Sequence, residues 1–361
     1  MAIRSTGEHA YFAASNSANG FRSYYSECFD ADRVRRVYAV KGGPGTGKSR
    51  FLREVAACGE ANGWSCEYIY CSSDPDSLDG MILSRGDACV ALMDATAPHV
   101  YEPSHPGIRE EIVNLGVFWS TERLTAHAEQ ITALNKEKSK AYRRAYRYLA
   151  GVGDMTRVRD ELVAPFVRRE KLRRFAQRLV KGIPDGKGFS SQPALIHSVG
   201  MRGRVGFDTY FAQADRIYRI EDCRGAGQYL MAELGNLAPG KKWKLRVSYD
   251  PIQPEKLDGL FLCDSGIAFV ICPAEECGYP ARQIDIRRFV DTAGLKSVRK
   301  ELNYAEQMRR AMLAGAVEAM DAVKDAHFRI EELYVDAMDF AAKEKFTKKF
   351  CQQLFHLQNT D

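Results

Sequence analysis

One stretch of about twenty residues constrains the fold more than any other part of the chain. Residues 34–40 are mostly β-branched or aromatic, which predicts a strand. The segment KGGPGTGKS follows and fits the pattern GxxxxGK[ST]. Its fixed positions are filled by Gly42, Gly47, Lys48 and Ser49. Apolar residues then recur at helical spacing over 51–56. Strand, glycine-rich turn and helix in this order are typical of a phosphate-binding loop in an α/β sheet.

Each part of this loop has a physical reason to bind phosphate. Glycines let the backbone N–H groups turn inward, and the following helix adds partial positive charge at its N-terminus. We expect Lys48 to bridge the β- and γ-phosphates and the Ser49 hydroxyl to bind magnesium. The predicted ligands are therefore ATP and Mg²⁺. The predicted nucleotide-binding residues are Gly42, Gly43, Pro44, Gly45, Thr46, Gly47, Lys48, Ser49 and Arg50.

A second acid is expected beside the magnesium. Residues 67–71 read as a strand followed by a polar loop, and residues 88–93 read as a buried parallel strand that ends at Asp94. Ligands of open α/β sheets lie at the carboxyl ends of such strands, which makes Asp94 a candidate. The competing acids are Asp74, Asp76 and Asp79.

An internal repeat distinguishes these acids. Residues 218–233 align with residues 38–53 at a constant offset of 180, but Gln228 replaces Lys48 and Tyr229 replaces Ser49. The repeat also puts Asp222 in place of Gly42 and Cys272 in place of Asp94. The acids matching Asp74 and Asp79 survive as Asp250 and Asp258. The second copy has therefore lost the counterpart of Asp94 together with its phosphate-binding groups. For this reason we assign Asp94 to magnesium and, with Lys48, to catalysis. The acids that both copies keep are assigned to the fold.

The loop resembles those of the P-loop NTPase superfamily, in a variant similar to that of AAA-type and helicase-type ATPases. No DE or DEAD box follows, so only the nucleotide site is carried over. With CSSDPDSLDG, DATAPH and the altered second loop, the chain resembles an uncharacterised bacterial family of tandem P-loop ATPases over nearly its whole length. The resemblance implies ATP binding and a cytoplasmic location. The second loop is degenerate here, which implies one active site and one inactive site.

The expected fold is α/β, with tandem P-loop NTPase-type parallel-sheet domains, each followed by a helical hairpin. Domain 1–190 carries the active loop and a hairpin over about 121–181, in which Gly151 and Gly153 form the turn. Domain 191–361 carries the degenerate loop and a hairpin over about 297–357.

The first helical segment is strongly basic. Residues 136–181 hold 15 lysines and arginines against 5 acids, and Tyr142, Tyr146 and Tyr148 alternate with arginines. Such a face suits nucleic acid or another polyanion, although a merely solvated face and an arginine finger for the γ-phosphate also fit.

These features predict a magnesium-dependent ATPase, a nucleoside triphosphate hydrolase of the P-loop class. The alternatives are a nucleotide-kinase-type phosphotransferase, with an acceptor near His99 and Arg109, and a nucleotide-gated nucleic-acid-binding protein. His99, Glu102 and His105 lie just past the end of the predicted strand 88–93, where a group that activates water could sit. The chain has no apolar run long enough to span a membrane, so no membrane partner is expected. Its ten cysteines lack a zinc-like spacing and are expected to be reduced thiols.

Overall fold

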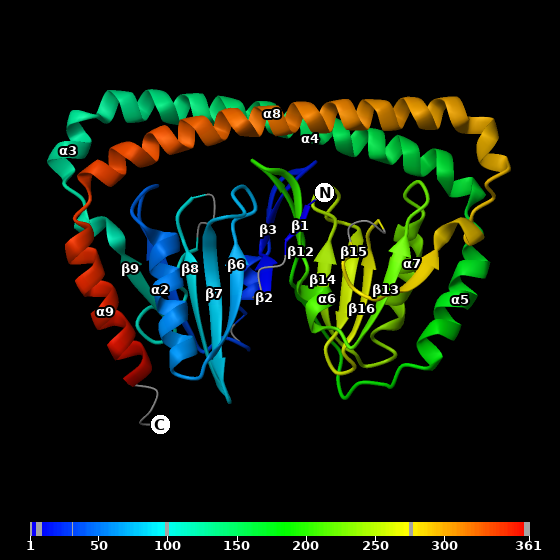
Figure 1. Cartoon of the computed structure of the whole chain (residues 1–361), viewed down its shortest axis with the longest axis horizontal. Helices are drawn as coiled ribbons and strands as arrows, with labels where there is room; N and C mark the ends of the chain where they lie inside the picture. Colours follow the sequence, from blue (N-terminus) through cyan, green and yellow to red (C-terminus); the bar gives the residue numbers. More distant parts are fainter. Residues whose placement is uncertain (1, 5–8, 31, 98–100, 274–276, 357–361) are drawn as a thin grey trace.

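The computed structural model describes residues 2–4, 9–30, 32–97, 101–273 and 277–356. Two α/β lobes lie side by side beneath a pair of long helices that run across both of them (Figure 1). Within the described residues no helix is long and apolar enough to cross a membrane. All ten cysteines are free thiols.

The first lobe is built on a six-stranded mixed sheet. Its strand order is β2-β6-β7-β8-β5-β9, and β7 runs antiparallel to both of its neighbours while the other pairs are parallel. The strands are β2 (His9–Phe12), β5 (Arg36–Lys41), β6 (Ser65–Tyr70), β7 (Leu78–Arg85), β8 (Ala88–Asp94) and β9 (Glu110–Asn114). The sheet is therefore mixed and mostly parallel, which corrects the predicted parallel sheet at β7. A short loop and a tight turn join β6, β7 and β8, and neither is long enough for a parallel crossover.

The second lobe repeats this topology strand for strand. Its order is β10-β14-β15-β16-β13-β17, with β15 antiparallel to its neighbours. The strands are β10 (Ser190–Pro193), β13 (Arg216–Glu221), β14 (Lys244–Tyr249), β15 (Leu257–Leu262), β16 (Ile267–Ile271) and β17 (Arg282–Asp285). Two equivalent α/β lobes in tandem confirm the architecture predicted from the repeat at this coarser level.

Shorter elements complete the lobes and their junction. A three-stranded sheet joins β1 (Ala2–Arg4), β12 (Gly203–Phe207) and β11 (His197–Gly200). The hairpin of β3 (Ala14–Ser17) and β4 (Gly20–Ser23) precedes α1 (Tyr25–Cys28). In the second half, α6 (Thr209–Gln213) precedes β13.

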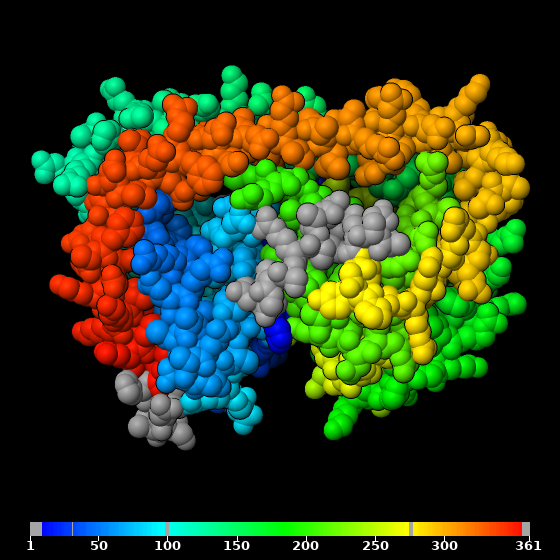
Figure 2. Space-filling model, viewed as in Figure 1, coloured from blue at the N-terminus to red at the C-terminus, as the bar shows by residue number. Residues whose placement is uncertain are grey.

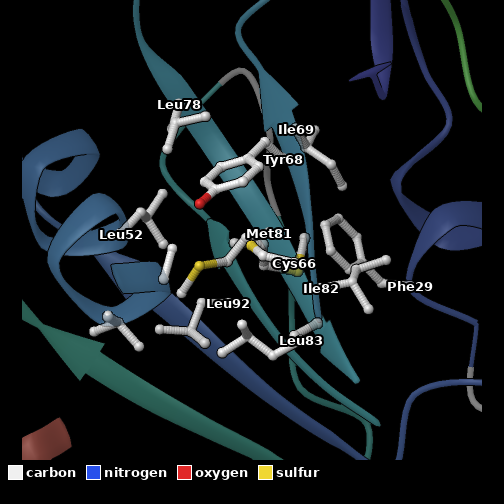
Figure 3. Close-up of a cluster of buried hydrophobic side chains, with 14 of the residues drawn as sticks. Phe29, Leu52, Cys66, Tyr68, Ile69, Leu78, Met81, Ile82, Leu83 and Leu92 are labelled. Carbon is white, nitrogen blue, oxygen red and sulfur yellow. The ribbon is translucent and has the colours of Figure 1, made fainter. Parts of the chain in front are cut away.

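Each sheet packs against a helix that follows its next-to-edge strand, β5 or β13. In the first lobe this helix is α2 (Lys48–Ala61), and in the second it is α7 (Gly227–Leu237). Figure 3 shows Leu52 of α2 facing Met81 and Leu92, which are paired across β7 and β8. The buried apolar side chains of this core hold the end of β5 and the start of α2 at one edge of the sheet.

The predicted helical hairpins are not formed. After α3 (Thr121–Ala126), α4 (Ala128–Val163) continues unbroken through Gly151 and Gly153 and packs antiparallel to α8 (Arg299–Ala337). A Cβ at Gly151 would clash with Met312 of α8, and one at Gly153 would clash with Ala18. These glycines therefore allow close packing rather than a turn, because a side chain at either position would separate the neighbouring segments.

The ends of the two long helices are exchanged between the lobes. Beyond α4, α5 (Arg169–Lys181) buries Leu172 and Ala176 in the core of the second lobe. Beyond α8, α9 (Phe340–His356) buries Phe350 and Leu354 in the core of the first lobe, beside α2. Each lobe is thus completed by a helix from the other half of the chain.

Candidate functional site

The glycine loop, residues 42–49, lies at the carboxyl end of β5 and leads into α2. Gly45 and Gly47 have φ angles of 73° and 77°, in the left-handed region that favours glycine. Thr46 is buried, and its hydroxyl donates to the carbonyl of Gly43 at 2.8 Å. The strand, turn and helix predicted around this loop are present. The loop therefore presents its backbone at the edge of the sheet where ligands of α/β proteins bind.

Lys48 connects the glycine loop to a partly buried acid, Asp94. Its ammonium donates to the carbonyl oxygens of Gly42 and Gly43, each at 2.9 Å, and lies 3.6 Å from Asp94 Oδ2. The Lys48 and Asp94 side chains are only 12% and 13% exposed. Thr96 fixes this arrangement, since its N–H donates to Asp94 and its hydroxyl donates to Gly42 O. Asp94 therefore lies beside Lys48, where the repeat comparison predicts a metal-side acid.

The remaining predicted binding residues differ in orientation. Ser49 Oγ accepts a hydrogen bond of 2.9 Å from the N–H of Leu78, so its hydroxyl lies next to the start of β7. The Arg50 side chain is 72% exposed and pairs with Glu54 on the outer surface of α2. Ser49 thus faces the site, whereas the side chain of Arg50 does not enter it.

Asp79 also belongs to this site, although the repeat comparison assigns it to the fold. Asp79 is buried at the start of β7, and the register pairs the next residue, Gly80, with Met93. Asp79 is consequently placed across from Asp94 on the same edge of the sheet. Burial raises the pKa of the Asp94 carboxyl, the charge of Lys48 opposes this rise, and the negative charge of Asp79 adds to it. Asp79 is therefore close enough to Asp94 for its charge to act on that carboxyl, which itself lies beside Lys48.

Asp74 and Asp76 serve the loop between β6 and β7. The Asp74 carboxylate accepts from the N–H of Asp76, and the Asp74 carbonyl accepts from the N–H of Ser77. Asp76 pairs with Arg202 of the second half. These contacts fit the turn role expected for Asp74.

Helices from the far end of the chain cover the glycine loop. Glu331 of α8 accepts a hydrogen bond of 3.3 Å from the Gly45 N–H through Oε1. A Cβ on Gly43 would lie 2.6 Å from the ring of Tyr334, and Gly47 lies beside Lys343 of α9. Figure 2 shows α8 and α9, coloured orange to red, lying against the first lobe. No local pattern around residues 42–49 indicates these partners, which are nearly 300 residues away in sequence.

The second loop, residues 222–229, has the same position in the second lobe but different chemistry. The Asp222 carboxylate accepts from the N–H groups of Gly225 and Gly227 at 2.7 and 2.6 Å. Tyr229, in place of Ser49, stacks beneath Arg169 at 4.6 Å. A carboxylate of the loop itself therefore accepts hydrogen bonds from the backbone N–H groups that a phosphate would need.

The acceptor site suggested by the kinase alternative does not form around Arg109. This residue precedes β9, which runs parallel to β5, so it lies at the edge of the sheet opposite the glycine loop. Its guanidinium donates to the carbonyl oxygens of Phe29 and Val34 and pairs with Glu110. Glu102 is 80% exposed, at 4.0 Å from Lys41. The exposed His105 lies near Arg109, bonded to Glu110 through its backbone N–H. His99 lies outside the described residues.

The basic segment of α4 has two different faces. Tyr142 and Tyr146 stack on one another and point inward, where their hydroxyls donate to Ser73 and Asn16. The predicted alternation of exposed aromatic and basic side chains is therefore wrong at these two positions. The exposed cations form a stripe on the other face, which we call the α4 stripe. It consists of Lys136, Lys140, Arg143, Arg144 and Arg147.

Comparisons with known proteins leave the site to be interpreted from its own chemistry. No family model, no curated protein and no solved structure matches this chain. Within the described residues no group of three or more His, Cys, Asp or Glu side chains is arranged to hold a metal ion. Magnesium commonly binds through one or two protein groups together with substrate phosphates, so the pair of Ser49 and Asp94 remains compatible with it.

Proposed function

We propose that the glycine loop binds a nucleoside triphosphate, with ATP and Mg²⁺ as the expected ligands, and that the protein hydrolyses it as a P-loop ATPase. The observation that carries this proposal is the position of Lys48. Its ammonium lies against the glycine loop and beside Asp94, at the carboxyl edge of the sheet. A cation, turned-in glycines and a helix N-terminus at one place are suited to a polyphosphate.

The residues at the site fit this ligand. The Gly45 N–H already donates a hydrogen bond to the Glu331 carboxylate, so it is oriented toward an anionic oxygen. Lys48 would exchange its carbonyl contacts for phosphate oxygens. Ser49 and Asp94 would hold magnesium, whose positive charge would assist the departure of ADP. During hydrolysis, Lys48 and the loop amides would stabilise the charge that develops on the transferred phosphoryl group.

The first prediction is that Lys48→Ala weakens Mg·ATP binding roughly ten- to a hundredfold, because it removes a charge-assisted bond to phosphate. Titration calorimetry on the full chain measures the affinity and the number of sites, which should be one per chain. The matched control is Gln228→Ala at the equivalent position of the second loop, where no effect is expected. Unchanged affinity in the Lys48 variant, or an equal loss in the Gln228 variant, contradicts the proposal. Phosphate release, followed without any acceptor, tests hydrolysis directly.

The α4 stripe favours a second candidate function, binding of a polyanion such as duplex nucleic acid. Its five cations are exposed and occupy one face of three helical turns, or roughly 16 Å. None of the five forms an ion pair within the described part of the chain. Like charges four residues apart destabilise a helix by about 0.2–0.5 kcal/mol per pair, so the stripe has a cost that the fold does not explain.

The partner that fits the stripe is a phosphate backbone. Arginines dominate it, and their planar guanidinium groups bind phosphate with two donors. Tyr142 and Tyr146 face inward, and of the three tyrosines only Tyr148 is exposed. A single exposed ring offers little of the base-stacking surface that single-strand binders use, so duplex is favoured over single strand. The exposed arginines lie on the face of α4 opposite these tyrosines, an orientation that does not support an arginine finger at the glycine loop.

The second prediction is a steep salt dependence of duplex binding. Four to six phosphate contacts give a log–log slope of about −3.5 to −5.5, and changing Arg143, Arg144 and Arg147 to Gln should flatten it by about 2 to 3. Fluorescence anisotropy over a salt series measures this slope. The control removes three charges from α9, at Lys345, Lys348 and Lys349, and should leave the slope unchanged. Equal flattening in both variants, or stronger binding to single strands, would contradict a duplex-binding stripe.

A further inference from the structure

We propose that Glu331 is an internal competitor of nucleotide phosphate, which holds α8 on the glycine loop until a nucleotide displaces it. The inference rests on the proposed function, because it assigns a regulatory contact to the same site. It gives the long helix α8 a role that neither the loop nor the repeat indicates.

The first support is the contact itself. The Glu331 carboxylate accepts from the Gly45 N–H, an amide that phosphate-binding loops direct at phosphate. The backbone also approaches closely, since a Cβ on Gly45 would lie 2.6 Å from the Glu331 carbonyl oxygen. Tyr334, one turn further along α8, covers Gly43. A nucleotide phosphate and this part of α8 therefore require the same space and the same donor.

The second support comes from the other lobe. There Asp222 occupies the amides of Gly225 and Gly227, and because it lies in the same loop it remains next to them. The end of α4 covers this loop in turn, since a Cβ on Gly225 would lie 2.7 Å from Asp160. Both loops are thus satisfied by a carboxylate of the chain. Only in the first lobe does that carboxylate come from a separate helix, which can withdraw.

The surroundings of Glu331 allow its contact with Gly45 to be broken and remade. Burial raises the pKa of its carboxyl, the Gly45 amide opposes this rise, and the negative charge of Asp74 adds to it. Lys48 and Lys138 are the nearby cations, and His327 Nε2 lies 3.6 Å from Glu331 Oε1. Burial and these two lysines lower the pKa of His327 to about 4, so His327 is neutral at pH 7 and adds no charge to the contact. Withdrawal would return the carboxylate to water and leave the cations for phosphate.

Displacement of Glu331 would also affect the second lobe, because α8 extends into its core. The opposite end of α8 buries Leu302 in the core of the second lobe, and α8 packs along α4 between these points. Figure 1 shows this continuous path above both lobes. A nucleotide at the first loop would therefore shift the equilibrium of the helix pair, because it favours the state in which Glu331 is withdrawn.

The third prediction tests this competition with Glu331→Gln, which removes the charge while keeping the shape. We expect Mg·ATP to bind about five- to thirtyfold more tightly than to the wild type, because the phosphate no longer displaces a charge-assisted contact. The control is Glu332→Gln on the exposed side of the same turn, which should match the wild type. Glu331→Asp should also bind ATP more tightly, because its side chain is too short to reach Gly45. This second variant keeps the test valid if Glu331→Gln does not fold.

The outcomes separate this inference from the proposed function. If the wild type binds ATP and neither Glu331 variant binds it more tightly, the competitor role is wrong and the nucleotide site stands. If Glu331→Gln lowers turnover while its affinity stays that of the wild type, Glu331 acts in the reaction instead, which also overturns the inference. If neither the wild type nor any variant binds ATP at millimolar concentration, the proposed function fails and the competitor role fails with it.

Discussion

At the scale of single residues, Asp94 beside Lys48 and its neighbour Asp79 decide how the site could hold magnesium. Asp94 lies 3.6 Å from the Lys48 ammonium, and Asp79 is buried across from it on β7. Because both carboxylates belong to one edge of the sheet, removal of either charge should disturb the site.

The fourth prediction concerns these two acids. Asp94→Asn should lower magnesium-dependent ATP turnover by at least tenfold, because Asp94 is the proposed metal ligand. Asp79→Asn should also lower it, but less, because Asp79 acts through the charge of Asp94. Turnover over a magnesium series, corrected for the folded fraction, measures both effects, and Asp76→Asn is the control. Full activity in the Asp94 variant would exclude it as a metal ligand, and full activity in the Asp79 variant would limit that residue to the fold.

The sequence could predict that Asp94 lies at the site but not that Asp79 lies next to it, for a reason visible in the second lobe. The repeat comparison assumes that an acid kept in both copies does the same work in both. Asp258, the counterpart of Asp79, instead pairs with buried His197, with Asp258 Oδ2 at 2.6 Å from His197 Nδ1. The acid was therefore retained beside a different partner. A sequence repeat reports which residues survive, whereas the reason for survival depends on neighbours brought together by folding.

At the scale of elements, local sequence patterns predicted the strand and helix around the glycine loop but not how the long helices pack. The strand and helix around the glycine loop follow from propensity and periodicity, and both are present as β5 and α2. Gly151 and Gly153 also match a turn signal, yet α4 passes straight through them, because packing against Met312 and Ala18 requires small residues there. Tertiary contacts therefore outweighed the local preference for a turn. The same kind of long-range packing places α8 and α9 over the glycine loop.

At the scale of the whole molecule, the exchange of α5 and α9 ties the lobes into one structure. Neither half of the sequence contains all the helices that cover its own sheet, so the proposed nucleotide site depends on the last helices of the chain. One partly buried ion pair also crosses directly between the lobes. Glu67 of β6 accepts from Arg246 of β14 at 2.5 and 3.0 Å and from Arg33 at 2.6 Å. The Glu67 and Arg246 side chains are 16% and 18% exposed.

The fifth prediction is that this ion pair gives the molecule an acid-sensitive junction. Burial alone would raise the pKa of Glu67, but Arg246 and Arg33 outweigh it and hold the pKa at about 2, below the usual 4.5. A lowered pKa contributes stability that is fully present above about pH 4.5 and is lost as the pH falls toward 2.

Glu67→Gln should therefore cost roughly 2–4 kcal/mol of unfolding free energy at pH 7, since it leaves two arginines without their acid. The difference between variant and wild type should shrink as the pH falls through this range. Denaturant unfolding from pH 7 to pH 3 measures it, with Glu111→Gln at the exposed pair with Arg36 as the control. A Glu67 variant no less stable at pH 7 than the Glu111 variant would show that the lobes are held together by their shared helices alone.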